Sequence, residues 1–164
     1  MKRRTFGLGV AATLVIPGCS SKFRTYNGPE VTSIVVNKGA RSMFLLHNQE
    51  ILEQYRFDLG FAPVGDKKVK GDGKTPEGTY RIDRHNPNSS FHLSLGISYP
   101  NSQDIAEAKA QGKSPGGDIF IHGQPNKLKA KGPDWTAGCI AVKNREIEQI
   151  YSMVRRGTLI TLRA

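Results

Sequence analysis

Short runs of apolar residues, separated by turn residues, dominate the chain from residue 31 onward. The first three runs, 31–38, 42–48 and 50–60, are joined by short polar turns, which is typical of an antiparallel β-meander. Residues 91–100 alternate between apolar and polar positions in their first half, as a half-buried strand does. Further strands are expected at 79–83, 116–123, 139–142 and 157–162. The pattern therefore predicts a sheet-dominated domain.

Two stretches have the character of short helices. The first covers 102–113, with Ser102 or Asp104 as a possible N-cap and Gly112 past its end. The second begins at Asn144, and its apolar residues lie at helical spacing: Ile147, Ile150, Tyr151 and Val154. A chain of 164 residues is long enough for one domain with a hydrophobic core. The predicted fold class is mainly β with two small helices, in one domain of residues 30–164.

The first nineteen residues have the features of an export signal. A basic start, which includes Arg3 and Arg4, precedes an apolar run of thirteen residues that is too short to span a bilayer. The following IPGC sequence resembles a bacterial lipobox, in which Cys19 becomes the lipidated first residue of the mature protein. Plain secretory cleavage nearby is the alternative reading. We therefore expect an exported domain on the periplasmic face, lipid-anchored to a bacterial membrane through a short tether, 20–29.

The charge of the chain narrows the range of partners. The formal net charge is +10, and removing the signal leaves 21 bases against 14 acids, so the folded part is basic as well. This charge fits either an anionic polymer or surface, or simple solubility. Nucleic acid is not expected, because the chain is exported and no aromatic residues alternate with its basic runs. No metal site is expected either, since the histidines lack any ligand spacing.

The second cysteine lies in an unusual setting. In the sequence DWTAGCIAV, Cys139 follows a polar turn and begins an apolar run. If Cys19 carries lipid, no partner remains for a disulfide with Cys139. A lone thiol in an oxidising compartment is a liability unless it is buried or used. The setting therefore favours either chemistry at Cys139 or an inert buried cysteine.

A histidine is a candidate base for this thiol. His122 ends one predicted strand and Cys139 begins the next, so the two side chains can meet if the strands are adjacent. A cysteine nucleophile needs such a base, and the base needs an acceptor for its other ring N–H, for which the Gly123 carbonyl is the simplest candidate. Gly138 allows a tight turn whose amides can point at an oxyanion. Spacing alone leaves open a buried cysteine beside a core histidine.

Three sequence elements together resemble the YkuD-type L,D-transpeptidase family. IHG followed by DWTAGCIAVKN is similar to the catalytic signature of that family, with His122 and Cys139 17 positions apart and Asn144 as the trailing asparagine. The upstream segment DGKTPEGTYRI, 72–82, is similar to the Thr-Pro-x-Gly-Thr element of the family. It supplies the residues Thr75, Pro76, Gly78 and Thr79. The three elements keep the order of the family and cover roughly residues 30–163.

The resemblance implies a β-sandwich-like fold and a cysteine enzyme without a cofactor. Cys139 is then the nucleophile that attacks a peptidoglycan stem-peptide amide, His122 the base and Gly123 the residue that orients it. Backbone N–H groups near Gly138 and Cys139 are expected to hold the oxyanion, and Thr136 belongs to the same oxyanion and substrate-binding group. Trp135 is either a wall for the substrate or an apolar anchor beneath the loop.

Two residues depart from the family pattern. Ala137 stands where the family commonly has His, and Ala141 stands where it has Arg. This version of the motif looks like the branch that includes an amidase releasing a lipoprotein from peptidoglycan. Hydrolysis through a thioacyl-enzyme is therefore slightly favoured as the reaction. The alternatives are an L,D-transpeptidase that forms cross-links or attaches protein to peptidoglycan, and a non-catalytic peptidoglycan-binding module.

Overall fold

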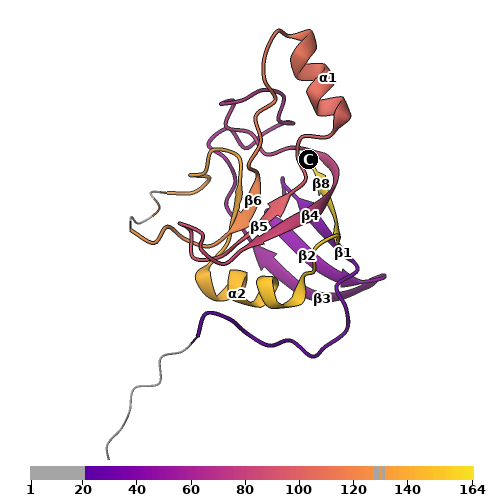
Figure 1. Cartoon of the computed structure of the whole chain (residues 1–164), viewed down its shortest axis with the longest axis vertical. Coiled ribbons are helices and arrows are strands. Elements are labelled where there is room, and N and C mark those ends of the chain that lie inside the picture. The colour runs from indigo at the N-terminus through magenta and orange to yellow at the C-terminus, as the bar shows by residue number, and fades with distance from the viewer. Residues whose placement is uncertain (1–20, 128–129, 131) are drawn as a thin grey trace, which may run out of the picture.

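Eight strands form one curled sheet in the computed structural model, which describes residues 21–127, 130 and 132–164 (Figure 1). The order across the sheet is β3-β2-β1-β8-β4-β5-β6-β7. The strands are β1 (Ser33–Asn37), β2 (Ser42–His47), β3 (Glu50–Arg56), β4 (Gly78–Asn86), β5 (Ser94–Ile97), β6 (Phe120–His122), β7 (Ile140–Ala141) and β8 (Leu159–Arg163). The predicted mainly β fold with two helices is confirmed. The predicted export signal and Cys19 lie outside the described residues.

The expected meander forms one half of the sheet. Strands β1, β2 and β3 pair antiparallel in sequence order, because only short turns join them. The last strand, β8, then enters between β1 and β4, parallel to the first and antiparallel to the second. Buried residues alternate with more exposed ones along β1 and β8, so each strand contributes one face to the core.

Strand β4 belongs to both halves of the sheet and so allows it to curl. Its first residues pair with β8, and its last residues pair with β5. The free end at β7 then meets the chain that leaves β3, through bridges from Asp58 to Ala141 and from Gly60 to Thr136. Side chains from both halves form one continuous core, which includes Ile34, Leu95 and Ile121. This closure brings the loop after β3 against the turn before β7.

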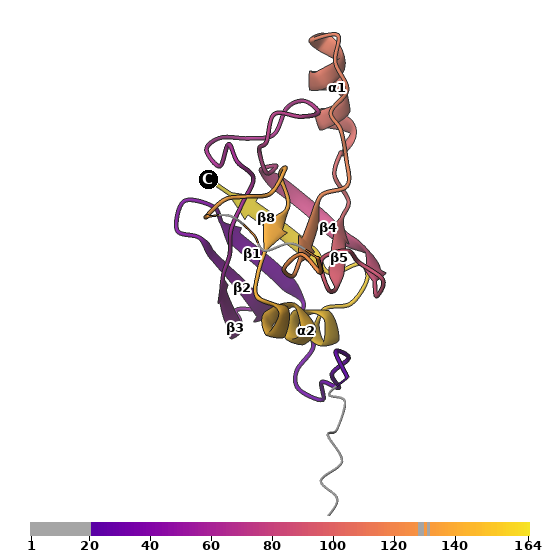
Figure 2. The same cartoon turned by 90° about the vertical axis from the view of Figure 1, so that its left-hand side faces the viewer.

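The two helices lie at opposite ends of the molecule (Figures 1 and 2). Helix α2 (Asn144–Met153) packs against the sheet and buries Ile147, Ile150 and Met153, and each such burial contributes about 1.5–3 kcal/mol. Helix α1 (Ser102–Ala110) stands away from the sheet and has only two buried residues. No helix among the described residues is long and apolar enough to cross a membrane.

Both N-caps predicted for α1, Ser102 and Asp104, are wrong. Asn101 is the cap, and its side chain accepts hydrogen bonds from the N–H groups of Gln103 and Asp104. Asp104 returns the bond by accepting from the Asn101 N–H at 2.8 Å, which completes a capping box. Asparagine is as good an N-cap as serine, and a capping box needs an acid three residues after the cap. Asp104 lies three residues after Asn101, so Asn101 is the cap.

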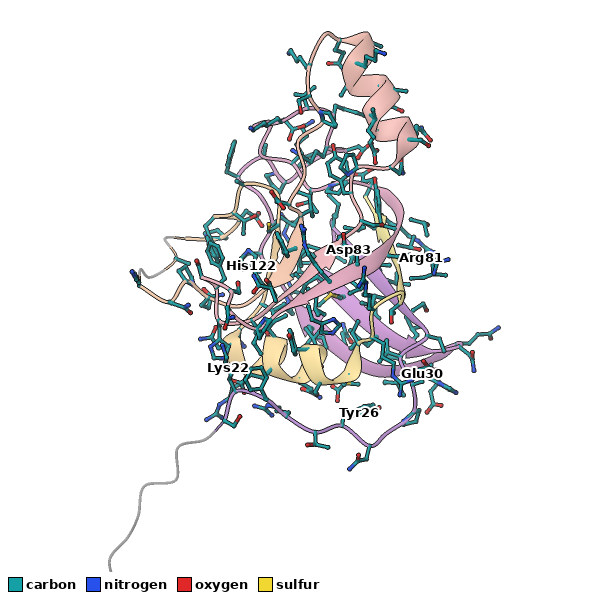
Figure 3. All side chains as sticks on the ribbon, in the orientation of Figure 1. Lys22, Tyr26, Glu30, Arg81, Asp83 and His122 are labelled. Carbon is teal, nitrogen blue, oxygen red and sulfur yellow. The ribbon has the colours of Figure 1, made fainter. Side chains whose placement is uncertain are left out.

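The segment before β1 lies on the domain surface beneath α2 (Figures 1 and 3). Lys22 Nζ donates a hydrogen bond to the Pro87 carbonyl at 2.6 Å, and Arg24 pairs with Glu148 of α2 at 2.8 Å. Tyr26 packs against the core. The described part of the predicted tether therefore contacts the domain along its length.

Candidate active site

The two predicted catalytic side chains line one cavity. His122 ends β6, and Cys139 immediately precedes β7, which pairs in parallel with β6. The cavity has a volume of about 270 Å³, and we call it the histidine-side cavity. Its lining consists of Asn86, Ser89, Ser90, Phe91, Ser94, Asp118, Phe120, His122 and Cys139. The sheet thus brings the thiol and the imidazole to one place, as the sequence predicts.

The His122 imidazole is buried and fixed in orientation. Its Nδ1 lies 2.7 Å from the Gly123 carbonyl oxygen, so the expected orienting contact is present. The ring packs against Phe91, at 4.4 Å between centroids, and against Trp135, at 5.6 Å. Burial lowers the pKa of His122, against the smaller effect of the Gly123 carbonyl. The imidazole is therefore neutral at neutral pH, and with Nδ1–H bound to the carbonyl its Nε2 lone pair is free to accept a proton.

The Cys139 side chain is half-buried and resides in its thiol form. Its Sγ lies 3.5 Å from the Asp118 carbonyl oxygen, to which the thiol donates. Burial raises the pKa of Cys139, and a hydrogen bond from the Phe120 backbone acts in the opposite direction with smaller effect. The thiolate is consequently scarce at neutral pH, so this cysteine depends on a base for reactivity.

A second cavity opens on the other side of the thiol. It has a volume of about 600 Å³, and we call it the lysine-side cavity. Its lining consists of Lys67, Lys70, Gly71, Ser114, Gly116, Gly117, Asp118, Ile119, Ala137 and Cys139. Cys139 and Asp118 line both cavities, so the sulfur lies at their junction. A substrate can therefore extend from Cys139 in two directions.

The turn before Cys139 uses the polar groups that sequence analysis assigned to the oxyanion. The Gly138 N–H donates to Thr136 Oγ1 at 3.1 Å, and that hydroxyl donates in turn to the Cys139 carbonyl at 2.7 Å. Both residues are buried. The Gly138 amide and the Thr136 hydroxyl are thus engaged with each other within the turn, and their role toward an oxyanion or a substrate stays a prediction.

The turn is also attached to the upstream Thr-Pro element. Thr75, which is fully buried, donates a hydrogen bond from its hydroxyl to the Gly138 carbonyl at 2.8 Å. Gly138 itself has a φ of +129°, and a Cβ there would lie 2.6 Å from the Lys74 carbonyl oxygen. Only glycine fits this close approach of two backbones. The two sequence motifs therefore meet at one hydrogen bond beside the nucleophile.

A buried lysine holds the Thr-Pro element in place. Lys38 follows β1, is 2% exposed, and donates to the carbonyls of Gly65 and Thr75 at 2.6 and 2.8 Å. It also pairs with Glu77 at 2.8 Å. All three N–H groups of the ammonium are used, as the burial of a charge requires. In the sequence, Lys38 is only the last residue of the apolar run 31–38, and nothing in that pattern indicates this role.

Asp134 joins the loop before Cys139 to two distant segments. Its carboxylate pairs with Arg41 at 2.6 Å and accepts from the Leu59 N–H at 2.9 Å. Burial alone would raise the pKa of Asp134, but the Arg41 guanidinium and the Leu59 amide together lower it. The acid at the head of the DWTAGCIAV motif is thus a positioning group for the loop.

The trailing asparagine of the motif supports the base. Asn144 Oδ1 accepts a hydrogen bond from the Gln124 N–H at 2.8 Å, and the Gln124 side chain donates to the Val142 carbonyl at 2.9 Å. These bonds fix the chain directly after Gly123, whose carbonyl orients the imidazole. Asn144 therefore connects the start of α2 to the histidine.

The two alanines that depart from the family pattern lie in different places. Ala137 is exposed and lines the lysine-side cavity beside Cys139. Ala141 is buried and lines a separate cavity with Arg41, Asp58 and Asp134. Only the substitution at Ala137 therefore changes the surroundings of the thiol directly.

Comparison with known proteins assigns these features to one family. The L,D-transpeptidase catalytic domain (YkuD) matches residues 32–162. The chain is 29% identical over 107 residues to the Escherichia coli K12 protein named "Putative L,D-transpeptidase YafK", a match that covers 64% of this chain and 38% of YafK. The chain thus spans less than half the length of that relative.

Solved structures share the same fold. Pgp2, a helical cell shape determining protein from Campylobacter jejuni, superposes with a TM-score of 0.64 at 28% identity over 88% of this chain and 51% of Pgp2. An L,D-transpeptidase from Mycobacterium smegmatis gives a TM-score of 0.54 at 15% identity, over 82% of this chain and 59% of that one. The second likeness supports the fold alone.

Replacing Thr75 by valine tests the link between the two motifs. We expect Thr75→Val to lower the free energy of unfolding by about 1–3 kcal/mol, because the variant leaves the buried Gly138 carbonyl without its donor. Thr79→Val is the matched control, since the Thr79 hydroxyl is exposed and bonds only the Thr161 hydroxyl at 3.2 Å; its cost should stay below about 0.5 kcal/mol. Urea denaturation measures both, and equal costs would contradict the assignment.

The pH dependence of alkylation tests the protonation states at the site. Because burial raises the pKa of Cys139, we expect its reaction with iodoacetamide to be slow at neutral pH and to keep rising beyond pH 9. Mass spectrometry of the peptide that contains Cys139 follows this site alone, and glutathione serves as the unperturbed thiol. A rate that is already constant below pH 7 would instead mean a preformed thiolate–imidazolium pair.

Proposed function

The chain belongs to the L,D-transpeptidase catalytic domain family, and from this premise we propose that it is an exported cysteine enzyme that cleaves a peptidoglycan stem-peptide amide. The observation that carries the proposal is the shared cavity of Cys139 and a neutral His122 whose Nδ1 is bound to the Gly123 carbonyl. This arrangement supplies a nucleophile, a base with its accepting nitrogen available, and a group that orients the base.

In the first half of the proposed reaction, Cys139 becomes acylated. Its thiol proton moves to His122 Nε2 while the sulfur attacks the carbonyl carbon of the scissile amide, which gives a tetrahedral oxyanion. Since the Gly138 amide is engaged by Thr136, we assign the oxyanion to the N–H of Cys139 itself, for which no acceptor lies among the described residues. The imidazolium then protonates the leaving amine, the carbon–nitrogen bond breaks, and a thioester remains on Cys139.

In the second half, the thioester is resolved by water or by an amine. His122 accepts a proton from the incoming nucleophile, which attacks the thioester carbon, and returns the proton to the sulfur as the carbon–sulfur bond breaks. Water yields a free carboxylate, and an amine yields a new amide. Both outcomes regenerate the thiol and the neutral imidazole, so the residues support either reaction.

We favour hydrolysis as the main reaction. In a transpeptidase, an acceptor amine must react with the thioester faster than water does. Orienting that amine can lower the barrier of its reaction by several kcal/mol. In this chain Ala137 offers no polar group to an acceptor in the lysine-side cavity, which supports the hydrolytic reading. Ala141 lies in another cavity and no longer bears on the choice. Transpeptidation is the alternative, and a non-catalytic binding module is the further one.

Incubation with defined muropeptides tests the reaction. In the presence of an added D-amino acid, we expect hydrolysed products to form faster than exchanged or cross-linked ones, and liquid chromatography with mass spectrometry separates the two. Cys139→Ala should abolish both products, and His122→Ala should lower both at least about 100-fold, because general base catalysis contributes on that order. Lys143→Ala is the control, because it removes a largely exposed charge, paired only with Glu146 among the described residues, that lies outside both cavities.

Each other outcome identifies a different function. Exchanged or cross-linked products that exceed the hydrolysed ones would make the protein a transpeptidase. Binding of muropeptides without any product, unchanged in Cys139→Ala, would make it a binding module. Release of a protein from intact peptidoglycan would place its substrate among peptidoglycan-linked lipoproteins.

We further propose that the domain is held on the periplasmic face of a bacterial membrane by lipid on Cys19. The lipobox-like IPGC sequence is the basis for this proposal. Mass spectrometry of the membrane fraction should find an N-terminal peptide that begins at a lipidated Cys19, and Cys19→Ser should shift the domain to the soluble fraction. An unmodified N-terminus beyond residue 19 would refute the anchor and leave the catalytic proposal untouched.

A further inference from the structure

An arginine on β4, Arg84, contacts two residues that line the histidine-side cavity. A bulge between Ile82 and Arg84 shifts the register of β4 against β5. A bulge of this kind turns the side chain that follows it and is common beside active sites. Arg84 Nη2 donates to Asp118 Oδ1 at 2.9 Å, and its guanidinium carbon lies 4.7 Å from the centroid of the Phe120 ring. Asp118 and Phe120 both line the cavity that holds Cys139 and His122.

The neighbouring strand leaves space for this arginine. Gly96 of β5 pairs with Arg84, and a Cβ at Gly96 would lie 2.5 Å from Arg84 Cγ and 2.7 Å from Arg84 Nε. Any other residue at this position would push the arginine off the sheet. The bulge, the glycine and the aromatic ring of Phe120 together hold one guanidinium in one orientation.

Two acids pair with Arg84, Asp118 at 2.9 Å and Asp83 at 3.8 Å, and the closer one, Asp118, is weakly held. The Asp118 side chain is 84% exposed and that of Arg84 is 49% exposed, and such solvated ion pairs contribute little to stability. A second carboxylate can therefore take the place of Asp118 on the guanidinium at small cost. The backbone carbonyl of Asp118 accepts from the Cys139 thiol, while its carboxylate accepts from Arg84. Asp118 therefore links the guanidinium to Cys139.

We propose that Arg84 is a specificity-determining residue that binds a substrate carboxylate next to the scissile amide, in exchange for Asp118. A planar guanidinium fixed at one edge suits a carboxylate, which it can hold by two parallel hydrogen bonds. Lys67, a cation that lines the lysine-side cavity, is buried and already bonded to Asp72 and the Val69 carbonyl. This inference rests on the proposed amide cleavage, because it names a feature of the substrate for that site.

Pairs of stem peptides that differ in one carboxyl group test the assignment. Each carboxyl of the peptide is presented in turn as the free acid or as the primary amide, and kcat/KM is measured for both. The wild-type protein should prefer the free acid at one position by about tenfold or more. In Arg84→Ala this preference should disappear through loss of activity on the acid, while activity on the amide stays within about twofold.

Arg81→Ala is the matched control on the same strand. Arg81 donates to the Gly157 carbonyl at 2.9 Å, and Figure 3 places it on the side of the domain away from His122. This variant should keep the full preference for the acid. If Arg84→Ala lowers activity on the acid and the amide equally, or if the wild type prefers the acid at no position, the inference is wrong.

Asp118→Asn should strengthen the preference for the free acid over the amide, whereas Arg84→Ala should abolish it. Asp118 has a φ of +55°, which asparagine tolerates, so this variant keeps the backbone and removes the closer of the two competing charges, while the more distant Asp83 remains. The KM for the acid substrate should fall about two- to fivefold, and an unchanged or higher KM would contradict the exchange. Wild-type protein that cleaves neither peptide would instead refute the proposed function, so the two failures are distinguishable.

Discussion

A buried hydrogen bond, from the Thr75 hydroxyl to the Gly138 carbonyl, fixes the turn that carries Cys139. Thr75 cannot move, because Lys38 binds its carbonyl from the start of the sheet. Gly138 cannot move either, because its amide is bonded to Thr136 and its Cα faces the Lys74 backbone. Cys139 thus receives its position from segments more than sixty residues away, while its own turn supplies only the local geometry.

Burial lowers the pKa of His122 and raises the pKa of Cys139. It favours the neutral form of each, so the thiol is a weaker acid and the imidazole a weaker base than in water. The resting site is therefore uncharged, in contrast to cysteine enzymes with a preformed ion pair. Proton transfer becomes favourable only as the sulfur attacks and negative charge passes to the substrate oxygen. Because the thiolate is scarce, the resting thiol is protected from electrophiles and oxidants in the solvent.

Local pattern and motif spacing were sufficient to predict the strands, both helices and the meeting of His122 with Cys139. These features depend on alternation of apolar residues and on two neighbouring strands, which a sequence displays directly. The contacts of Lys38, Asp134 and Arg84 could not be predicted, because each joins an irregular loop to a distant element. A charged residue in a turn or on a strand edge looks solvated in sequence, and only the curled sheet reveals its partner. The bond between the Gly138 amide and the Thr136 hydroxyl could not be predicted for the same reason.

The place of β8 in the sheet has a consequence for the order of folding. The strand formed by Leu159–Arg163 lies between β1 and β4, so the two halves of the sheet have no common edge until it is inserted. Pairing residues 33–37 with 159–163 requires closure of a loop of more than a hundred residues, which is slow and has a high entropic cost. A nascent chain therefore cannot complete this domain on the ribosome before residue 163 has emerged. Until then the segments that would enclose Cys139 remain apart, and the growing chain carries no assembled site around this thiol.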